Sequence, residues 1–155
     1  MPPQHPEPAE RMKPEPVVDL RLHPGALGCI VVGGALGALA RYGVGRVVHV
    51  PIDGFPRGTF AINVSGAFAL GCFLSFVRER HWAVKYARPL FALGFCGAFT
   101  TFSTMAVDTV TLAKDGHAPL GIGYLLLSVA FGLVTCAAGV AAGRVAARAG
   151  TSGPV

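Results

Sequence analysis

Residues 94–109 read GFCGAFTTFSTMAVDT and combine an apolar composition with a dense group of hydroxyls. These hydroxyls flank the ring of Phe102 and belong to Thr100, Thr101, Ser103 and Thr104. The surrounding sequence stays apolar over residues 89–112. A helix of about 20 apolar residues is long enough to cross a bilayer, so this stretch is predicted to hold polar groups deep inside a membrane span.

The whole chain has the composition of a membrane protein. Its 155 residues are 52% apolar and only 14% charged, and the mean hydropathy of +0.55 lies outside the usual range of soluble domains. Four stretches are long enough to span a bilayer: 25–48, 58–77, 89–112 and 119–143. The sequence therefore predicts an all-α integral membrane protein with four transmembrane helices and both termini on one side.

Short tails are predicted on either side of a single membrane domain, residues 22–147. Residues 1–21 are rich in Pro and Glu and poor in apolar residues, which predicts a disordered tail. Residues 148–155 form a second, shorter tail. The first apolar run starts late and continues for a full span, so we expect this helix to be retained rather than cleaved as a signal peptide.

The distribution of cations predicts the orientation in the membrane. The net charge of +5 arises at helix ends rather than on a basic surface with interleaved aromatic residues, so no nucleic-acid partner is predicted. The side of the termini and the second loop carries Arg11, Lys13, Arg21, Arg78, Arg80, Lys85, Arg88, Arg144 and Arg148. The opposite side carries Arg46, Arg57 and Lys114. The positive-inside rule then predicts a multi-pass protein of the inner (plasma) membrane with cytoplasmic termini.

Small residues at four-residue spacing predict closely packed helices. The pairs are Gly33 and Gly37, Gly34 and Ala38, Ala67 and Gly71, and Gly139 and Gly143. Such faces let helix backbones approach one another in lipid. Four helices packed in this way are too few to enclose a wide aqueous pore, so we expect an oligomer or a very narrow path.

An enzyme is not predicted. The histidines lie in the tail or beside loops, and none is spaced to activate an intramembrane serine or cysteine nucleophile. The four cysteines fall one in each span without metal-ligand spacing, and they are interpreted as small apolar residues. The sequence also contains no phosphate-binding loop motif.

Two polar residues in the first two spans are candidates for a pathway. Asn63 has two interpretations: an interhelical hydrogen bond, or an amide donor that lines a pathway. Arg41 lies near the end of the first span, where its side chain can reach the interface. A cation at that position would attract anions to a neighbouring vestibule.

The third span is predicted to be interrupted near residues 97–101. Gly94 and Gly97 weaken the helix, and the hydroxyls that follow compete for backbone carbonyls. Broken backbone at membrane depth persists only where it is buried in protein or lines a cavity, and its freed carbonyls could hold a cation. Hydroxyl donors, an amide and the positive edge of Phe102 suit a small anion. Asp108 is the exception and is expected near a mouth of the path.

Three sequence blocks resemble the signature blocks of the Fluc (CrcB-type) fluoride channels. They are GALARY at residues 37–42, GTFAIN at residues 58–63 and GFCGAFTTFST at residues 94–104. The third block is highly specific, whereas the first would be weak alone. The resemblance covers roughly residues 25–143 and omits both tails.

The resemblance implies a passive fluoride exporter that limits fluoride toxicity. It would be an antiparallel dimer of four-helix subunits with two narrow pores and a structural Na⁺ at the dimer centre. In that family backbone carbonyls at the break in the third helix hold the Na⁺, and these fall here on Gly97 and Thr100. The family's pore residues fall on Asn63, Phe102, Ser103, Thr104 and Tyr124. Dehydration of the small fluoride ion by donors and ring edges would provide selectivity.

The sequence departs from the family pattern at Met105. The family places a second pore phenylalanine at this position. Methionine is apolar and polarisable but has no ring edge. The resemblance therefore predicts one modified fluoride station at Met105.

The charge asymmetry is a second departure. A chain that inserts in both orientations needs nearly balanced loops, and this chain is not balanced. We therefore hypothesise a fixed orientation and a heterodimer with a separately encoded homologue, with the homodimer as the alternative.

Two other functions are compatible with parts of the sequence. A small four-helix multidrug exporter is also an antiparallel dimer, but it needs a membrane-embedded carboxylate, and the first span carries Arg41 instead. A non-transporting membrane scaffold suits the Pro-rich tail but leaves the buried donors without a role.

Overall fold

The computed structural model describes residues 24–48, 54–79 and 84–149, and all regular elements in these ranges are helical. The long helices are α1 (Pro24–Val47), α2 (Arg57–Glu79) and α6 (Ala118–Ala149). A composite span runs between α2 and α6: α3 (Val84–Ala87), the π-helix η2 (Arg88–Cys96), α4 (Gly97–Phe99) and α5 (Phe102–Lys114). The predicted tail 1–21 and most of the tail 148–155 lie outside the described residues.

Four helical stretches are long and apolar enough to cross a membrane. They are Pro24–Val47, Arg57–Arg78, Lys85–Lys114 and Ala118–Ala149, of 22 to 32 residues each. At about 1.5 Å per residue, even the shortest exceeds a hydrocarbon core of roughly 30 Å. The prediction of an all-helical membrane protein with four spans is confirmed. The third and fourth spans extend past their predicted ends because helices continue through terminal Lys and Arg residues, whose long side chains reach the interface.

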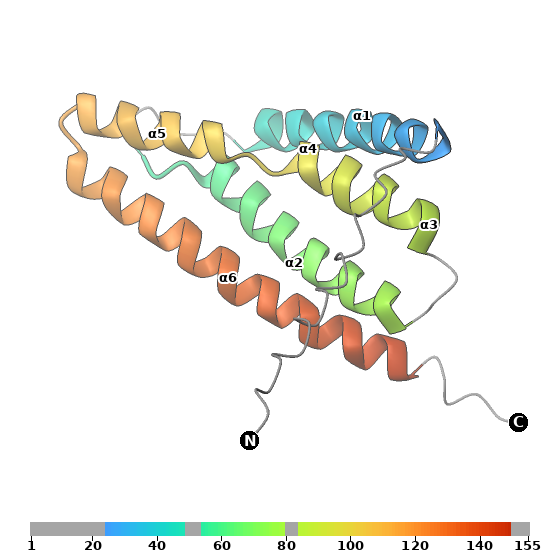
Figure 1. Cartoon of the computed structure of the whole chain (residues 1–155). Helices are drawn as coiled ribbons and strands as arrows, with labels where there is room; N and C mark the ends of the chain where they lie inside the picture. Colours follow the sequence, from blue (N-terminus) through green and yellow to red (C-terminus); the bar gives the residue numbers. More distant parts are fainter. Residues whose placement is uncertain (1–23, 49–53, 80–83, 150–155) are drawn as a thin grey trace, which may run out of the picture.

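The helices form two pairs. α2 and α6 lie side by side along most of their length, and α1 lies along η2 (Figure 1). The start of α1 and the end of α6 are at the same end of the bundle (Figure 1). Large apolar side chains on the outer surface, among them Val31, Leu39 and Leu133, are well exposed in the single chain, as expected for lipid or a partner subunit.

Glycines set the close approach within each pair. A Cβ atom at Gly33 or Gly37 of α1 would overlap the carbonyl oxygens of Leu90 and Phe95. On α6, a Cβ atom at Gly139 would overlap the Phe68 carbonyl oxygen. A Cβ atom at Gly71 or Gly143 would likewise overlap a carbonyl oxygen of the facing helix. The predicted packing is therefore confirmed at five of the small residues, because a larger residue would push the backbones apart.

The prediction for the pair of Gly34 and Ala38 is wrong at Gly34 within this chain. A Cβ atom at Gly34 would meet nothing within 4 Å, so no described residue faces its Cβ position. Residues 33 and 34 lie about 100° apart around an α-helix. Of these two residues, only Gly33 therefore presents its Cβ position to η2.

The third span differs most from a regular helix. Its first half contains nine residues of π-helix, which the sequence analysis did not predict. Phe91, Phe95 and Phe99 form a row of stacked rings along it, with centroids 5.3 and 5.6 Å apart. Phe73 of α2 packs against the first of these rings at 4.5 Å. This aromatic row fixes the face that the span turns toward α2.

Candidate functional site

Two extended residues interrupt the third span between α4 and α5. Thr100 has φ −76° and ψ 156°, and Thr101 has φ −149° and ψ 117°. Both residues therefore have strand-like dihedrals inside a helical span (Figure 1). They lie near the middle of the candidate membrane span Lys85–Lys114.

The side chain of Asn63 pairs with this extended backbone. Asn63 Nδ2 donates a hydrogen bond to the Thr101 carbonyl at 2.9 Å. The Thr101 N–H donates to Asn63 Oδ1 at 2.8 Å. The amide thus replaces the helical partners that Thr101 lacks, and this satisfies backbone groups that would otherwise be unpaired at membrane depth. One of the two interpretations of Asn63, the interhelical hydrogen bond, is observed.

The amide of Asn63 also keeps a free donor. An asparagine amide carries two N–H groups, and only one is used by the bond to Thr101. The other has no hydrogen-bond partner among the residues that the structure describes. Gly66, less than one turn further along α2, leaves room for the interruption, because a Cβ atom there would overlap the Thr100 methyl group. The Asn63 hydrogen bond and the close approach at Gly66 therefore both place α2 directly against the extended residues.

The interruption releases two backbone carbonyls. In a continuous helix the Thr101 N–H would bond the Gly97 carbonyl, but here it donates to Asn63. The Thr104 N–H would bond the Thr100 carbonyl, but it donates to Thr101 Oγ1 at 3.2 Å. Among the described residues, neither carbonyl oxygen accepts a backbone hydrogen bond other than those inside a single helix. Gly97 and Thr100 therefore present oxygens that are able to accept another partner.

The first two hydroxyls of the TTFST sequence hold the local structure together. Thr100 Oγ1 donates to the Cys96 carbonyl at 2.9 Å, one turn back. Thr101 caps the N-terminus of α5, since its Oγ1 accepts from the Thr104 N–H and donates to Thr104 Oγ1 at 2.9 Å. Ser103 Oγ lies 3.3 Å from the same Thr101 oxygen. The protons of Thr100 and Thr101 are therefore used within the span.

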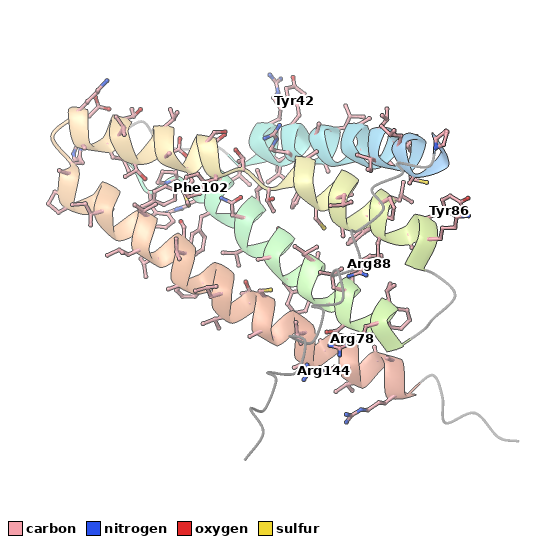
Figure 2. All side chains as sticks on the ribbon, viewed as in Figure 1. Tyr42, Arg78, Tyr86, Arg88, Phe102 and Arg144 are labelled. Atoms are coloured by element: carbon pink, nitrogen blue, oxygen red, sulfur yellow. The ribbon has the colours of Figure 1, made fainter. Side chains whose placement is uncertain are left out.

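The residues after the interruption divide into an exposed and a buried set. Phe102 is the first residue of α5 (Figure 2) and its side chain is 73% exposed in the single chain. Ser103 and Thr104 are also exposed. Met105 is buried, at 5% exposure. The predicted pore residues of α5 thus form an outward face, except for Met105.

A hollow of about 310 Å³ lies beside the interruption. Among its lining residues are Asn63, Thr101, Phe102, Met105 and Ser128. The structure therefore brings three predicted pore residues, on two different spans, to one cavity. Tyr124, Ser103 and Thr104 do not line it.

A second hollow, of about 340 Å³, lies on the other side of Thr101. Arg41, Thr59 and Thr104 line it together with Thr101. Thr101 is shared by the two hollows, so the interruption lies between them. Arg41 is half-buried here, where its charge would attract anions toward the hydroxyls.

Tyr124 lies in the core of the protein. Its side chain is fully buried, and its Oη donates to Asp108 Oδ2 at 3.4 Å. The Thr59 hydroxyl donates to the same oxygen at 2.7 Å. The ring packs edge-on against Phe55, with centroids 5.2 Å apart. Two donors therefore satisfy the carboxylate of Asp108, which the sequence analysis expected near a mouth.

Ser128 is a site residue that the sequence did not predict. Its side chain is 4% exposed and lines the first hollow, opposite residues of α2 and α5. The hydroxyl lies beside that of Tyr124 without a well-formed hydrogen bond to any described residue. A lone serine in an apolar helix gives little signal, but its position four residues after Tyr124 places both on one helix face.

A family model described as CrcB-like protein, Camphor Resistance (CrcB), matches residues 28–140. The chain belongs to this CrcB-like family. The match reaches from α1 into α6 and contains the whole interruption of the third span.

Several curated relatives resemble this CrcB-like protein. A Streptomyces avermitilis protein named fluoride-specific ion channel FluC 3 is 44% identical over 126 residues, which are 81% of this chain and 62% of the relative. FluC 1 of Mycolicibacterium paratuberculosis is 43% identical over 70% of this chain and 82% of its own length. FluC of Paracoccus denitrificans is 38% identical over 74% and 91%. The chain thus spans less than two thirds of the Streptomyces protein but most of the other two.

Proposed function

We propose that this chain forms a passive, fluoride-specific channel that lets fluoride leave the cytoplasm. The observation that carries this proposal is the extended pair Thr100 and Thr101, paired with Asn63 beside the exposed ring of Phe102. Irregular backbone at membrane depth is tolerated where it is buried in protein or lines a cavity or ion site, and here it lies beside a hollow. The names of the curated relatives support the same function.

Selectivity follows from the donors around the first hollow. The free N–H of Asn63, the Ser128 hydroxyl and the positive edge of the Phe102 ring can replace the water around a small anion. No carboxylate from the described part of the chain lines this hollow. The second hollow, with Arg41, is the vestibule that collects anions before they enter.

The single chain supports a dimeric channel. Ser103 and Thr104 are exposed polar residues next to Phe102 in the middle of a membrane span. Within the described chain their hydroxyls contact Thr101, and lipid tails offer them no further partner, so a second subunit is the better environment for this face. The proposed assembly is antiparallel, and each subunit completes a pore of the other.

A Na⁺ ion fits the released carbonyls of Gly97 and Thr100. Unwound carbonyls at the end of a half-helix are typical Na⁺ ligands in membrane proteins. The bound cation would supply positive charge that offsets the cost of bringing anions into the interior. These two residues would hold it together with their counterparts in the second subunit.

The subunit pairing follows from the charges at the two ends. The described residues place Arg78, Lys85, Arg88, Arg144 and Arg148 at one end, against Arg46, Arg57 and Lys114 at the other. This bias favours one orientation with cytoplasmic termini in the plasma membrane. The proposed partner is therefore an oppositely oriented homologue. Co-purification of such a partner is expected, whereas equal insertion of the lone chain in both directions would rule out the heterodimer.

The multidrug-exporter alternative gains no support from the described carboxylates. Asp108, the embedded one, accepts hydrogen bonds from Thr59 and Tyr124 rather than facing an open cavity. Fluoride efflux from vesicles that contain purified protein, alone and with a candidate partner, tests the proposed function. No efflux in either case would reject it.

A further inference from the structure

A basic pocket opens at the end of the bundle where α2 and α6 finish. It is a hollow of about 690 Å³, and three arginines from three different elements line it: Arg78 of α2, Arg88 of η2 and Arg144 of α6. Figure 2 shows the three side chains near one another at this end. The basic pocket is remote from Asn63 and Phe102 and shares no lining residue with the two hollows described above.

The three guanidinium groups have no counter-charge among the side chains that the structure describes. None of Arg78, Arg88 and Arg144 makes a hydrogen bond or ion pair with one of these side chains. A smaller hollow of about 270 Å³ continues the positive surface between Arg78, Arg144 and Arg148. Like charges gathered at one place repel one another unless an anion lies between them. The arrangement therefore favours a bound anion.

The walls of the basic pocket indicate what kind of anion fits. Besides the arginines, the lining contains Leu74, Val77 and Val140, which are apolar. A guanidinium group binds phosphate through two parallel hydrogen bonds. A ligand that contacts both the arginines and the apolar residues would carry a phosphate group and a hydrocarbon chain next to it. This combination describes a phospholipid rather than a free ion.

The depth of the basic pocket agrees with a lipid headgroup. Arg78 is the last residue of the candidate span Arg57–Arg78, and Arg88 lies at the start of the next span. Arg144 lies in the last turns of α6. Cations at such positions lie at the level of the lipid phosphates, and basic pockets between membrane helices bind anionic lipid headgroups.

The geometry points to this basic pocket as a binding site for the phosphate of an anionic phospholipid, with an acyl chain along the α2–α6 surface. The acidic residues of the N-terminal segment are a weaker match, because Arg11, Lys13 and Arg21 are interspersed among Glu7, Glu10, Glu15 and Asp19. That segment therefore has little net negative charge to offer. The site is independent of fluoride conduction.

Native mass spectrometry of the purified full-length protein tests the site. The protein is delipidated in mild detergent and titrated with phosphatidylglycerol, or with phosphatidylcholine of the same acyl chains. We expect phosphatidylglycerol to be retained at least about fivefold better, because only its headgroup is a net anion. Equal retention of the two lipids would overturn the proposal.

Charge-matched variants locate the binding. The double variant Arg88→Gln/Arg144→Gln is expected to lose the preference for phosphatidylglycerol. The control Arg46→Gln/Arg57→Gln removes the same amount of charge at the other end of the bundle. It should keep the preference for phosphatidylglycerol. If both variants lose the preference equally, binding depends on net charge rather than on this pocket. If the first variant does not fold, Arg88→Lys/Arg144→Lys is used instead, because it keeps the charge. We expect its preference for phosphatidylglycerol to fall about twofold, because lysine cannot form the two parallel hydrogen bonds of a guanidinium group.

A third arm separates a lipid from a free ion. Millimolar inorganic phosphate is added to the delipidated protein, and the melting temperature is compared with that of protein given phosphatidylglycerol. Only the lipid is expected to raise the melting temperature. An equal rise with phosphate alone would show that the pocket takes a free anion and would reject the lipid assignment.

Discussion

Asn63 and Thr101 are joined by two hydrogen bonds, with Nδ2 donating to the Thr101 carbonyl at 2.9 Å and the Thr101 N–H donating to Oδ1 at 2.8 Å. One side chain of α2 thus stabilises the interruption of the third span. The same pairing takes the Thr101 N–H away from the Gly97 carbonyl, whereas the Thr101 hydroxyl takes the Thr104 N–H away from the Thr100 carbonyl. The site therefore depends on the Asn63 contact for its shape and for one of its two free oxygens.

The first prediction concerns the stability that Asn63 provides. Asn63→Ala leaves the N–H and carbonyl of Thr101 unpaired, and a buried unpaired polar group costs roughly 1 to 3 kcal/mol. We expect a lower melting temperature in detergent. Ser65→Ala is the matched control, because the Ser65 hydroxyl bonds only carbonyls of its own helix. Equal melting temperatures for the two variants would show that the pairing does not stabilise the interruption.

Phe102 is predicted to affect conduction more than folding. Its side chain is 73% exposed in the single chain, so Phe102→Ala should cost the subunit less than about 1 kcal/mol. Fluoride flux should nevertheless fall, because the ring edge is lost. Val107→Ala, at another exposed position of α5, should leave both properties unchanged. A Phe102→Ala protein with full flux would remove Phe102 from the pore.

Ser128 is predicted to separate stability from function. Its hydroxyl is buried without a well-formed hydrogen bond, so Ser128→Ala should leave the melting temperature unchanged or raise it, since an unsatisfied buried hydroxyl costs about 1 kcal/mol or more. Fluoride flux should fall several-fold because the first hollow loses a donor. A lower melting temperature with unchanged flux would instead indicate a purely structural serine.

The α2–α6 contact gives a prediction about packing. Gly139→Val inserts a side chain where even a Cβ atom would overlap the Phe68 carbonyl oxygen. We expect a loss of about 1 to 3 kcal/mol or more, seen as poor expression and a lower melting temperature. Gly132→Val on the same helix is the control, because a Cβ atom there would meet nothing within 4 Å. The explanation by close packing fails if the two variants are equally stable.

Hydropathy alone was enough to predict four spans, and four-residue spacing was enough to locate Gly33, Gly37 and Gly139 at helix contacts. The same spacing wrongly included Gly34, since spacing along one helix does not say which face meets a neighbour. The π-helix η2 was missed because its hydrogen-bonding pattern has no distinct residue signature. Its aromatic row has the four-residue spacing of an ordinary helix.

The site was predicted in outline but not in detail. The cluster of hydroxyls marked the interruption, yet the sequence could not show that Thr100 and Thr101 use their protons within the span. It also could not decide between two interpretations of Asn63. The structure shows that a single amide can bond the backbone and keep one N–H for a ligand. Such sharing depends on three-dimensional placement, which spacing does not encode.

The most direct test of the fluoride pathway is efflux from liposomes loaded with either fluoride or chloride. Vesicles with purified protein, supplied with its partner subunit if one co-purifies, should release fluoride quickly and retain chloride. Asn63→Ala should reduce fluoride release by at least about tenfold, as expected when a positioned donor is removed, while Ser65→Ala should match the wild type. Equal release of both halides, or full fluoride release by Asn63→Ala, would contradict a selective path at this interruption.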